Sequence, residues 1–176
     1  LRSSDAGASW VRQWSGTWSY LSAVSFSDRD NGWVVGDNGT ILHTTNGGIT
    51  WSPQTSGTTK WLRSVCAMDS ATGVCVGNGG TILRTSDGGS HWINQPSGTT
   101  TTLQDVSFTD PDTGTIVGSS GAILRTTDRG THWTGQTSDA THLEGVSFVD
   151  ATHGYAVGSN GTVIKTTNGG ATWTSQ

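Results

Sequence analysis

Carboxylate, amide, hydroxyl and imidazole side chains recur together in this 176-residue chain, in five copies of one eight-residue motif. The motif reads Ser/Thr, any residue, Asp/Asn, any residue, Gly, two further residues and Trp, as in Thr44–Trp51. A catalytic or metal-binding role would need the carboxylate in these copies. Asn46 and Asn168 replace it in two of them, whereas a tight turn needs only a hydrogen-bond acceptor. We therefore expect the motif to shape turns and not to do chemistry.

The five motifs fall at a nearly constant spacing, which indicates a repeat architecture. Their acidic or amide residues are Asp5, Asn46, Asp87, Asp128 and Asn168. Their tryptophans are Trp10, Trp51, Trp92, Trp133 and Trp173, so that each repeat is 40 or 41 residues long. Each Trp should begin a strand and bring a large apolar surface to it.

The segments between the motifs predict three further short strands in each repeat. In the first full repeat these are residues 21–26, 33–36 and 40–44, with a polar turn after the first strand and a Gly-containing hairpin after the second. Four short antiparallel strands per repeat of about forty residues are typical of a β-propeller blade. We predict an all-β propeller domain or segment over residues 1–176. It comprises a terminal hairpin at 1–20 and blades at 21–61, 62–102, 103–142 and 143–176.

This motif resembles the Asp-box of the BNR-type repeats in sialidases, sortilin-like receptors and many extracellular β-propellers. Residues 32–48 and their counterparts also resemble the photosystem II assembly factor repeat family, known as Ycf48-like. Four and a half blades do not close a ring simply. The resemblance therefore implies a piece of a longer propeller, or a ring completed by further blades or by a second chain. Because bacterial members of this repeat class are often exported, we also expect an extracellular or periplasmic protein.

Cys66 and Cys75 lie in the first and second strands of one blade. We expect strand alternation to turn both side chains toward one face, within reach of a disulfide. Related exported repeats often carry a Cys pair at these two positions. A disulfide would indicate an oxidising compartment, and the alternative is a pair of buried free thiols in a cytosolic protein.

Composition and spacing argue against several functions. Charged residues make up 12% of the chain and its net charge is −4, which does not suit a nucleic-acid partner. No apolar stretch is long enough for a membrane span. The five histidines show no metal-ligand spacing, and we expect neither a metal nor a cofactor. Glu144 is the only glutamate, whereas a glycosidase needs two facing carboxylates. We therefore predict no catalytic residues.

Recognition should use the propeller face that carries the hairpins between second and third strands, because there the repeats differ most. The positions just before each first strand hold Tyr20, Trp61, Thr102 and His142, and should ring the central opening. Other candidate binding residues on this face are Trp18, Lys60, Asp37, Asn78 and Asn160. Aromatic rings beside amides suit either a carbohydrate or a peptide, although Tyr20 and Trp61 could simply pack between blades. Arg63 is expected only to line the channel.

The sequence thus favours a non-enzymatic binding or scaffold propeller of an exported protein, which contacts a protein or a glycan. One alternative is a fragment of an Asp-box glycoside hydrolase whose catalytic residues lie outside this segment. Another is an assembly factor for a membrane complex, as the photosystem-like repeats imply.

Overall fold

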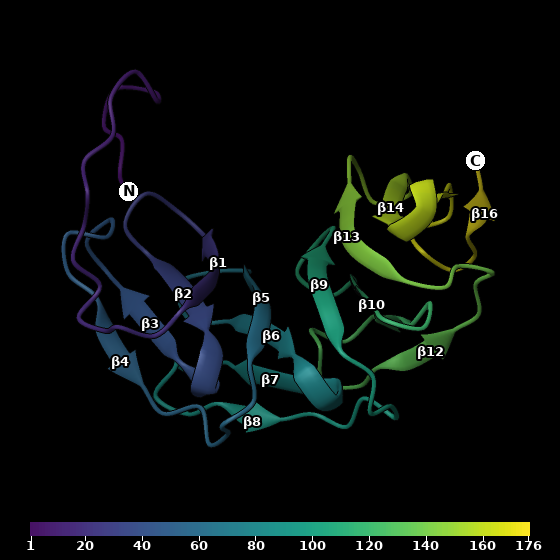
Figure 1. The fold of residues 1–176 in the computed structure, drawn as a ribbon, viewed down its shortest axis with the longest axis horizontal. Coiled ribbons are helices and arrows are strands. Elements are labelled where there is room, and N and C mark those ends of the chain that lie inside the picture. The colour runs from purple at the N-terminus through teal and green to yellow at the C-terminus, as the bar shows by residue number, and fades with distance from the viewer.

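The computed structural model describes residues 1–176 and contains four separate four-stranded antiparallel sheets, one for each predicted blade. Within each sheet the strands follow chain order, and each strand pairs with the next (Figure 1). The first strands are β1 (Leu21–Phe26), β5 (Leu62–Ala67), β9 (Leu103–Phe108) and β13 (Leu143–Phe148). The second strands are β2 (Gly32–Gly36), β6 (Gly73–Gly77), β10 (Gly114–Gly118) and β14 (Gly154–Gly158). The third strands are β3 (Ile41–Thr44), β7 (Thr81–Thr85), β11 (Ile123–Thr126) and β15 (Val163–Thr166). The fourth strands are β4 (Ser52–Gln54), β8 (Ile93–Asn94), β12 (Thr134–Gln136) and β16 (Thr174–Ser175).

The predicted hairpins between second and third strands are tight turns, and three of them contain one turn of 3-10 helix. These are η1 (Asp37–Gly39), η2 (Asn78–Gly80) and η3 (Ser159–Gly161). In η1, Asn38 and Gly39 take positive φ angles of 49° and 67°, a conformation that Asn and Gly adopt more readily than other residues. The Gly-containing loops of the sequence therefore fix where each hairpin turns.

The hydrophobic core lies between the blades rather than within one of them. Each interface joins the second and third strands of one blade to the first, second and third strands of the following blade. Between blades 1 and 2, for example, Trp33 and Val35 of β2 pack with Leu62 and Val65 of β5. Because its two faces contact two different blades, each second strand in blades 1–3 is buried along its whole length. Such a fold needs successive blades to bury its apolar side chains.

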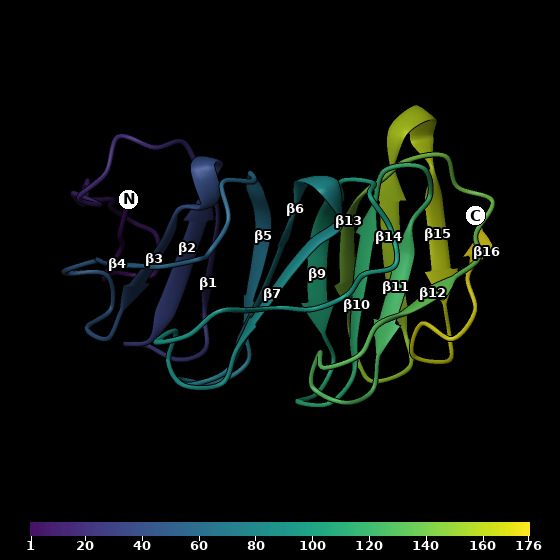
Figure 2. The ribbon, with the colours of Figure 1, turned by 90° about the horizontal axis from the view of Figure 1, so that it is seen from below.

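The four blades form an arc, with β1, β5, β9 and β13 on its inner side (Figure 1). In the side view the 3-10 turns lie along one edge of the arc, and the turns between first and second strands lie along the opposite edge (Figure 2). Backbone hydrogen bonds fix both edges. Gly39 donates to the carbonyl oxygen of Lys60 (2.9 Å), which places the blade connectors beside the 3-10 turns. Gly47 donates to Asp30 (2.9 Å), which places the Asp-boxes on the other edge. We call the edge with the 3-10 turns the hairpin face.

Residues 1–20 precede blade 1, and the only strand pairing in this segment is one bridge. Arg2 and Val11 exchange two backbone hydrogen bonds of 2.8 Å, around an Asp-box turn at Asp5. This pairing is shorter than the terminal hairpin that the repeat pattern suggests.

The structure contains no helix that is long and apolar enough to cross a membrane.

The predicted disulfide between Cys66 and Cys75 is wrong, because the strand register turns the two side chains to opposite faces of their sheet. Cys75 lies opposite Val65, and Cys66 lies opposite Val74. Directly opposed residues share a face, so Cys75 packs between blades 1 and 2, whereas Cys66 packs between blades 2 and 3. Both thiols are free. They therefore give no argument for an oxidising compartment.

Both thiols should be unreactive until the protein unfolds. Burial raises the pKa of Cys66 and of the fully buried Cys75, which disfavours the reactive thiolate. We expect Ellman's reagent to label neither thiol rapidly in the native protein and to label both in denaturant without a reductant. Finding no free thiol in the denatured, unreduced protein would contradict the register.

Candidate functional site

Each Asp-box is a closed turn in which two side chains accept hydrogen bonds from the backbone. In the box of blade 1, Thr44 Oγ1 accepts from the Gly48 amide (2.9 Å), and Asn46 Oδ1 accepts from the Thr50 amide (3.0 Å). The Asn46 amide nitrogen donates to Thr50 Oγ1 (2.8 Å). The Thr44 and Asn46 side chains thus make their hydrogen bonds within the turn, and neither is directed at a common site.

The boxes with Asp use the same geometry and add a charge. Asp87 Oδ1 accepts from the His91 amide (3.0 Å), while Asp87 Oδ2 lies 2.7 Å from His91 Nδ1. These hydrogen bonds, led by the one from the His91 amide, lower the pKa of Asp87 to about 2. In Asp128 the cost of partial burial is outweighed by hydrogen bonds from His132, and its pKa is also about 2. Both His–Asp pairs therefore belong to turns. No group of three or more His, Cys, Asp or Glu side chains is placed to hold a metal ion.

The acidic boxes should make stability fall in acid. A carboxyl group whose folded-state pKa is lowered from 3.8 to about 2 stabilises the native state fully above about pH 4, and this contribution is lost as the pH falls toward 2. Asn46 shows that an amide can fill the same position. We expect the double variant Asp87→Asn/Asp128→Asn to keep the fold and to lose less of its melting temperature between pH 5 and pH 2.5 than the parent chain. An identical acid response, measured by circular dichroism, would contradict this origin.

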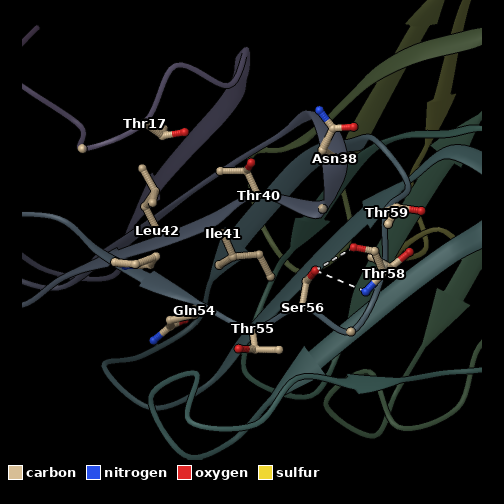
Figure 3. A pocket seen from close by; sticks show the side chains of 14 residues that line it. Thr17, Asn38, Thr40, Ile41, Leu42, Gln54, Thr55, Ser56, Thr58 and Thr59 are labelled. Atoms are coloured by element: carbon tan, nitrogen blue, oxygen red, sulfur yellow. Dashed lines mark hydrogen bonds between the residues drawn. The ribbon is translucent and has the colours of Figure 1, made fainter.

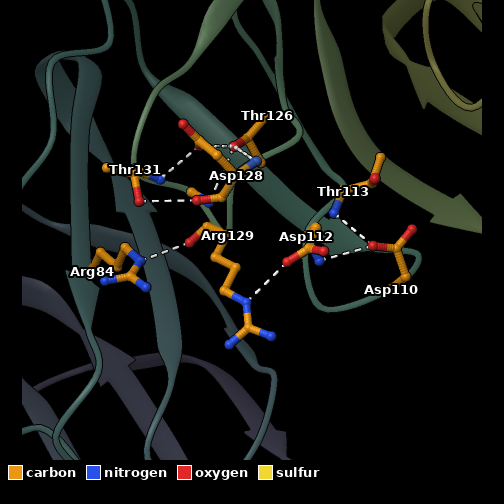
Figure 4. Close-up of polar contacts among 9 residues, drawn as sticks. Arg84, Asp110, Asp112, Thr113, Thr126, Asp128, Arg129 and Thr131 are labelled. Carbon is orange, nitrogen blue, oxygen red and sulfur yellow. Dashed lines mark hydrogen bonds and ion pairs between the residues drawn. The ribbon is translucent and has the colours of Figure 1, made fainter.

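The polar contacts on the Asp-box edge also connect adjacent blades (Figure 4). Arg84 Nε donates to the carbonyl oxygen of Arg129 in the following blade (2.7 Å). Arg129 in turn forms an ion pair with Asp112 (2.9 Å). Arg125 repeats the first contact one blade later, by donating to Gly169 (2.9 Å). Because the contact recurs with the repeat, we assign these arginines to blade packing.

A polar cavity lies at the outer side of blade 1 and is also a feature of the repeat. It measures about 800 Å³ and is lined largely by hydroxyl and amide groups, among them Thr40, Gln54 and Thr55 (Figure 3). Ser56 Oγ donates to the carbonyl oxygen of Thr58 (3.2 Å), which orders the connector along one wall. The corresponding connector of blade 2, at residues 94–100, lines a similar cavity of about 650 Å³. Because the corresponding connectors of two blades line similar cavities, we assign these cavities to the repeat and not to a specific binding site.

The hairpin face carries one cluster that does not recur, which we call the aromatic–basic patch (Tyr20, Lys60, Trp61, Arg63 and Asn78). The rings of Tyr20 and Trp61 meet edge to face, with 5.5 Å between their centroids. Arg63 lies over the Trp61 ring, with its Cζ 3.8 Å from the centroid, and donates through Nε to Asn78 Oδ1 (2.9 Å). Lys60 lies beside Gly79 of η2. Two cations and two aromatic rings are therefore gathered on a chain whose net charge is −4.

Backbone geometry holds Trp61 and Arg63 in place. The Asn78 amide donates to the Trp61 carbonyl oxygen (2.9 Å), and a side chain at Gly77 would collide with that oxygen. The pairing of β5 with β6 slips between Leu62 and Ser64, so that Arg63 is the extra residue of a β-bulge. A bulge redirects a side chain out of the ordinary alternation, and here it brings the guanidinium group over the Trp61 ring. This patch suits an acidic group attached to an apolar or aromatic one.

The other predicted binding residues are Trp18, Thr102, His142, Asp37 and Asn160, and of these Asp37 adjoins the patch through Tyr20. Trp18 is 89% exposed and pairs with Trp14 (5.0 Å between ring centroids). Thr102 and His142 precede their first strands as expected, and their carbonyl oxygens accept from Ser119 (2.9 Å) and Ser159 (3.2 Å).

Two of the predicted binding residues, Asp37 and Asn160, lie in the hairpin turns. Asp37 begins η1, and its amide donates to the carbonyl oxygen of Tyr20 (2.9 Å). Asn160 lies in η3 with a φ of 57°. His142 Nε2 is 3.6 Å from Glu144, so the blade 4 end of the hairpin face carries an acidic group. The face therefore carries the cations Lys60 and Arg63 where blades 1 and 2 meet, with the carboxylate of Asp37 in blade 1 and that of Glu144 in blade 4.

Arg63 is the site residue whose role the sequence did not predict. Its counterparts Ser22, Gln104 and Glu144 occupy the same bulge in the other blades, and no spacing rule reveals a bulge before the pairing is known. The only feature of the sequence that pointed to this role is the position of Arg63 two residues after Trp61. Trp14 was also missed, because it lies in the irregular segment before blade 1.

Comparison with known proteins relates the chain to one family by sequence and to two groups by structure. The model of the family described as "Photosynthesis system II assembly factor YCF48" matches residues 2–99, which is more than half of the chain. No curated protein sequence matches. A solved structure described as YCF48 bound to D1 peptide has a TM-score of 0.62 and 18% identity, over 92% of this chain and 83% of that one. YCF48 from Cyanidioschyzon merolae has a TM-score of 0.69 and 25% identity, over 89% of this chain and 56% of that one.

Two glycoside hydrolase structures share the blade architecture. An ancestral GH74 enzyme has a TM-score of 0.71 and 15% identity, and this chain spans 25% of its length. The GH74 xyloglucanase from Xanthomonas campestris has a TM-score of 0.67 and 13% identity, and the chain spans 30% of it. At such identities the likeness shows the fold alone.

Proposed function

We propose that this chain, which belongs to the photosynthesis system II assembly factor YCF48 family, is a non-enzymatic propeller module that binds an extended acidic segment of a partner protein. The observation that carries the proposal is the aromatic–basic patch, in which Arg63 lies over Trp61 and Tyr20 packs against the same ring. Because the patch departs from the repeat, the blade fold does not by itself require it.

The chemistry of the patch favours a peptide with a carboxylate beside an apolar side chain. The Arg63 guanidinium uses Nε for Asn78, and a planar guanidinium has further N–H donors on its other two nitrogens. Tyr20 is 64% exposed and offers an apolar surface beside that charge. Aromatic and Arg side chains are the residues that most often dominate protein interfaces.

We propose a subunit of a membrane complex as the partner. The family description and the solved relative with a bound D1 peptide support this choice. A carbohydrate ligand remains the second candidate, since Tyr20 and Trp61 present aromatic surface, but the adjoining cations favour an acidic peptide. We propose an exported location as well. This rests on the repeat class alone, because the cysteines do not support it.

The test is calorimetric titration of the 176-residue chain with a D1 peptide and with the same peptide after its carboxylates are amidated. We expect saturable binding of the unmodified D1 peptide that weakens as salt is raised, and much weaker binding of the amidated one. Equal binding of both peptides, or no binding of either, would contradict the proposal. Binding on a glycan array without peptide binding would favour the carbohydrate ligand instead.

A further inference from the structure

Two exposed tryptophans, Trp14 and Trp18, lie in the connector before blade 1, where the other connectors carry no aromatic residue. Trp14 is 59% exposed, and Trp18 is still more exposed. In the next two connectors these positions hold Thr or Pro, namely Thr55, Thr59, Pro96 and Thr100. These four residues are exposed as well, although their connectors have a complete blade on either side. The exposure of the two indole rings is therefore a property of the connector position.

Hydrogen bonds within the connector hold the two tryptophans in a defined arrangement. Ser15 Oγ donates to the carbonyl oxygen of Thr17 (3.3 Å), and the Ser19 amide donates to Thr17 Oγ1 (3.1 Å). The connector after blade 1 repeats both bonds, at 3.2 and 3.1 Å. The local sequence thus sets this conformation. Within it the two indole rings meet edge to face, with 5.0 Å between their centroids.

The connector also forms one wall of the polar cavity of blade 1. Gly16 and Thr17, which lie between the two tryptophans in sequence, line this cavity, with Thr17 on one side and Thr55 on the other (Figure 3). The similar cavity of blade 2 has no such wall, because only residues 79–81 and 94–100 line it. None of the residues that line the blade 1 cavity is charged. The tryptophan pair, which does not recur, therefore borders an uncharged polar surface.

We propose that Trp14 and Trp18 form a binding platform for a neutral oligosaccharide of all-equatorial hexoses, of which a β-1,4-linked glucan is the simplest. Such a sugar ring presents C–H groups on its two faces, and an indole ring offers a matching flat apolar surface. Its equatorial hydroxyls need hydrogen-bond partners, which the hydroxyl and amide groups of the adjoining wall can supply. An acidic ligand would find no cation among these lining residues, in contrast to the aromatic–basic patch.

The test is calorimetric titration of the 176-residue chain with cellohexaose. We expect saturable binding that does not change with salt, because the ligand is neutral. The tryptophan emission should shift to shorter wavelength as the exposed indole rings are covered.

Variants locate the binding. Trp14→Thr and Trp18→Thr should each weaken it at least about tenfold, as expected for a Trp that dominates a contact. Both should keep the parent circular dichroism spectrum, because Thr55 and Thr59 occupy the same positions in the next connector.

Two further measurements separate this platform from the aromatic–basic patch. Trp61→Ala should bind cellohexaose as the parent chain does, and Trp18→Thr should still bind the D1 peptide. Loss of cellohexaose binding in Trp61→Ala would place the sugar on the aromatic–basic patch and overturn the proposal.

Two other results would also overturn it. The first is equal binding of cellohexaose by the parent chain and Trp18→Thr. The second is no binding of cellohexaose. If the parent chain then sedimented with phosphatidylcholine vesicles and Trp18→Thr did not, the pair would be a contact with a lipid surface, where Trp is also favoured.

Discussion

Replacing Trp33 by Ala should lower the free energy of unfolding by about 3–5 kcal/mol, the usual cost of removing a large aromatic side chain from a core. Trp33 is fully buried between blades 1 and 2. Its ring stacks on His43 (4.6 Å between centroids) and meets Trp92 edge to face (6.0 Å). Its Nε1 donates to Gln54 Oε1, which also accepts from Trp92 Nε1, both at 3.0 Å. The change therefore removes packing and one hydrogen bond at the same place.

The matched control is Trp18→Ala, which removes the same side chain from an 89% exposed position. It should change the free energy of unfolding by no more than about 0.5 kcal/mol. Urea unfolding followed by circular dichroism measures both variants. Similar losses in the two would mean that the blades do not depend on the interface between them.

The second large effect should be on binding. We expect Trp61→Ala and Arg63→Gln each to weaken binding of the D1 peptide by about 30-fold or more, as for a residue that contributes about 2 kcal/mol or more to an interface. Trp61→Ala removes the surface on which Arg63 lies as well as the contact with Tyr20. Arg63→Gln removes the charge and leaves Trp61 in place.

Two control variants are available for this prediction. Arg84→Gln removes a guanidinium from the Asp-box edge, where Arg84 contacts the carbonyl oxygen of Arg129. Trp18→Ala removes an exposed indole from the segment before blade 1. Both should bind the peptide as the parent chain does. If Arg84→Gln weakened binding as much as Arg63→Gln, the effect would be one of general charge and not of the patch.

The repeat pattern was sufficient to predict the fold. The five Asp-boxes, the Gly-containing hairpins and the short alternating strands predicted four-stranded blades, and these are confirmed. The first strand of blade 1 has the predicted bounds of 21–26. Its Leu and Val recur at the same positions in the later first strands, where they face the preceding blade. A pattern written several times in one chain specifies a local structure more strongly than any single copy.

The disulfide and the role of Arg63 could not be predicted, and both depend on strand register. Whether Cys66 and Cys75 share a face is decided by which residues are directly opposed, and a shift of one residue reverses the answer. Arg63 contacts Trp61 because a bulge interrupts the same pair of strands. Alternation along one strand does not reveal such a slip between two strands.

The most direct test of where this protein binds its partner is cross-linking of the D1 peptide carrying a photoreactive benzoyl-phenylalanine, with mass spectrometry of the products. We predict cross-links to residues 60–63 and 78–79 on the hairpin face, and their loss in Trp61→Ala. Cross-links concentrated on the Asp-box turns at residues 85–92 and 126–133, unchanged in Trp61→Ala, would contradict it.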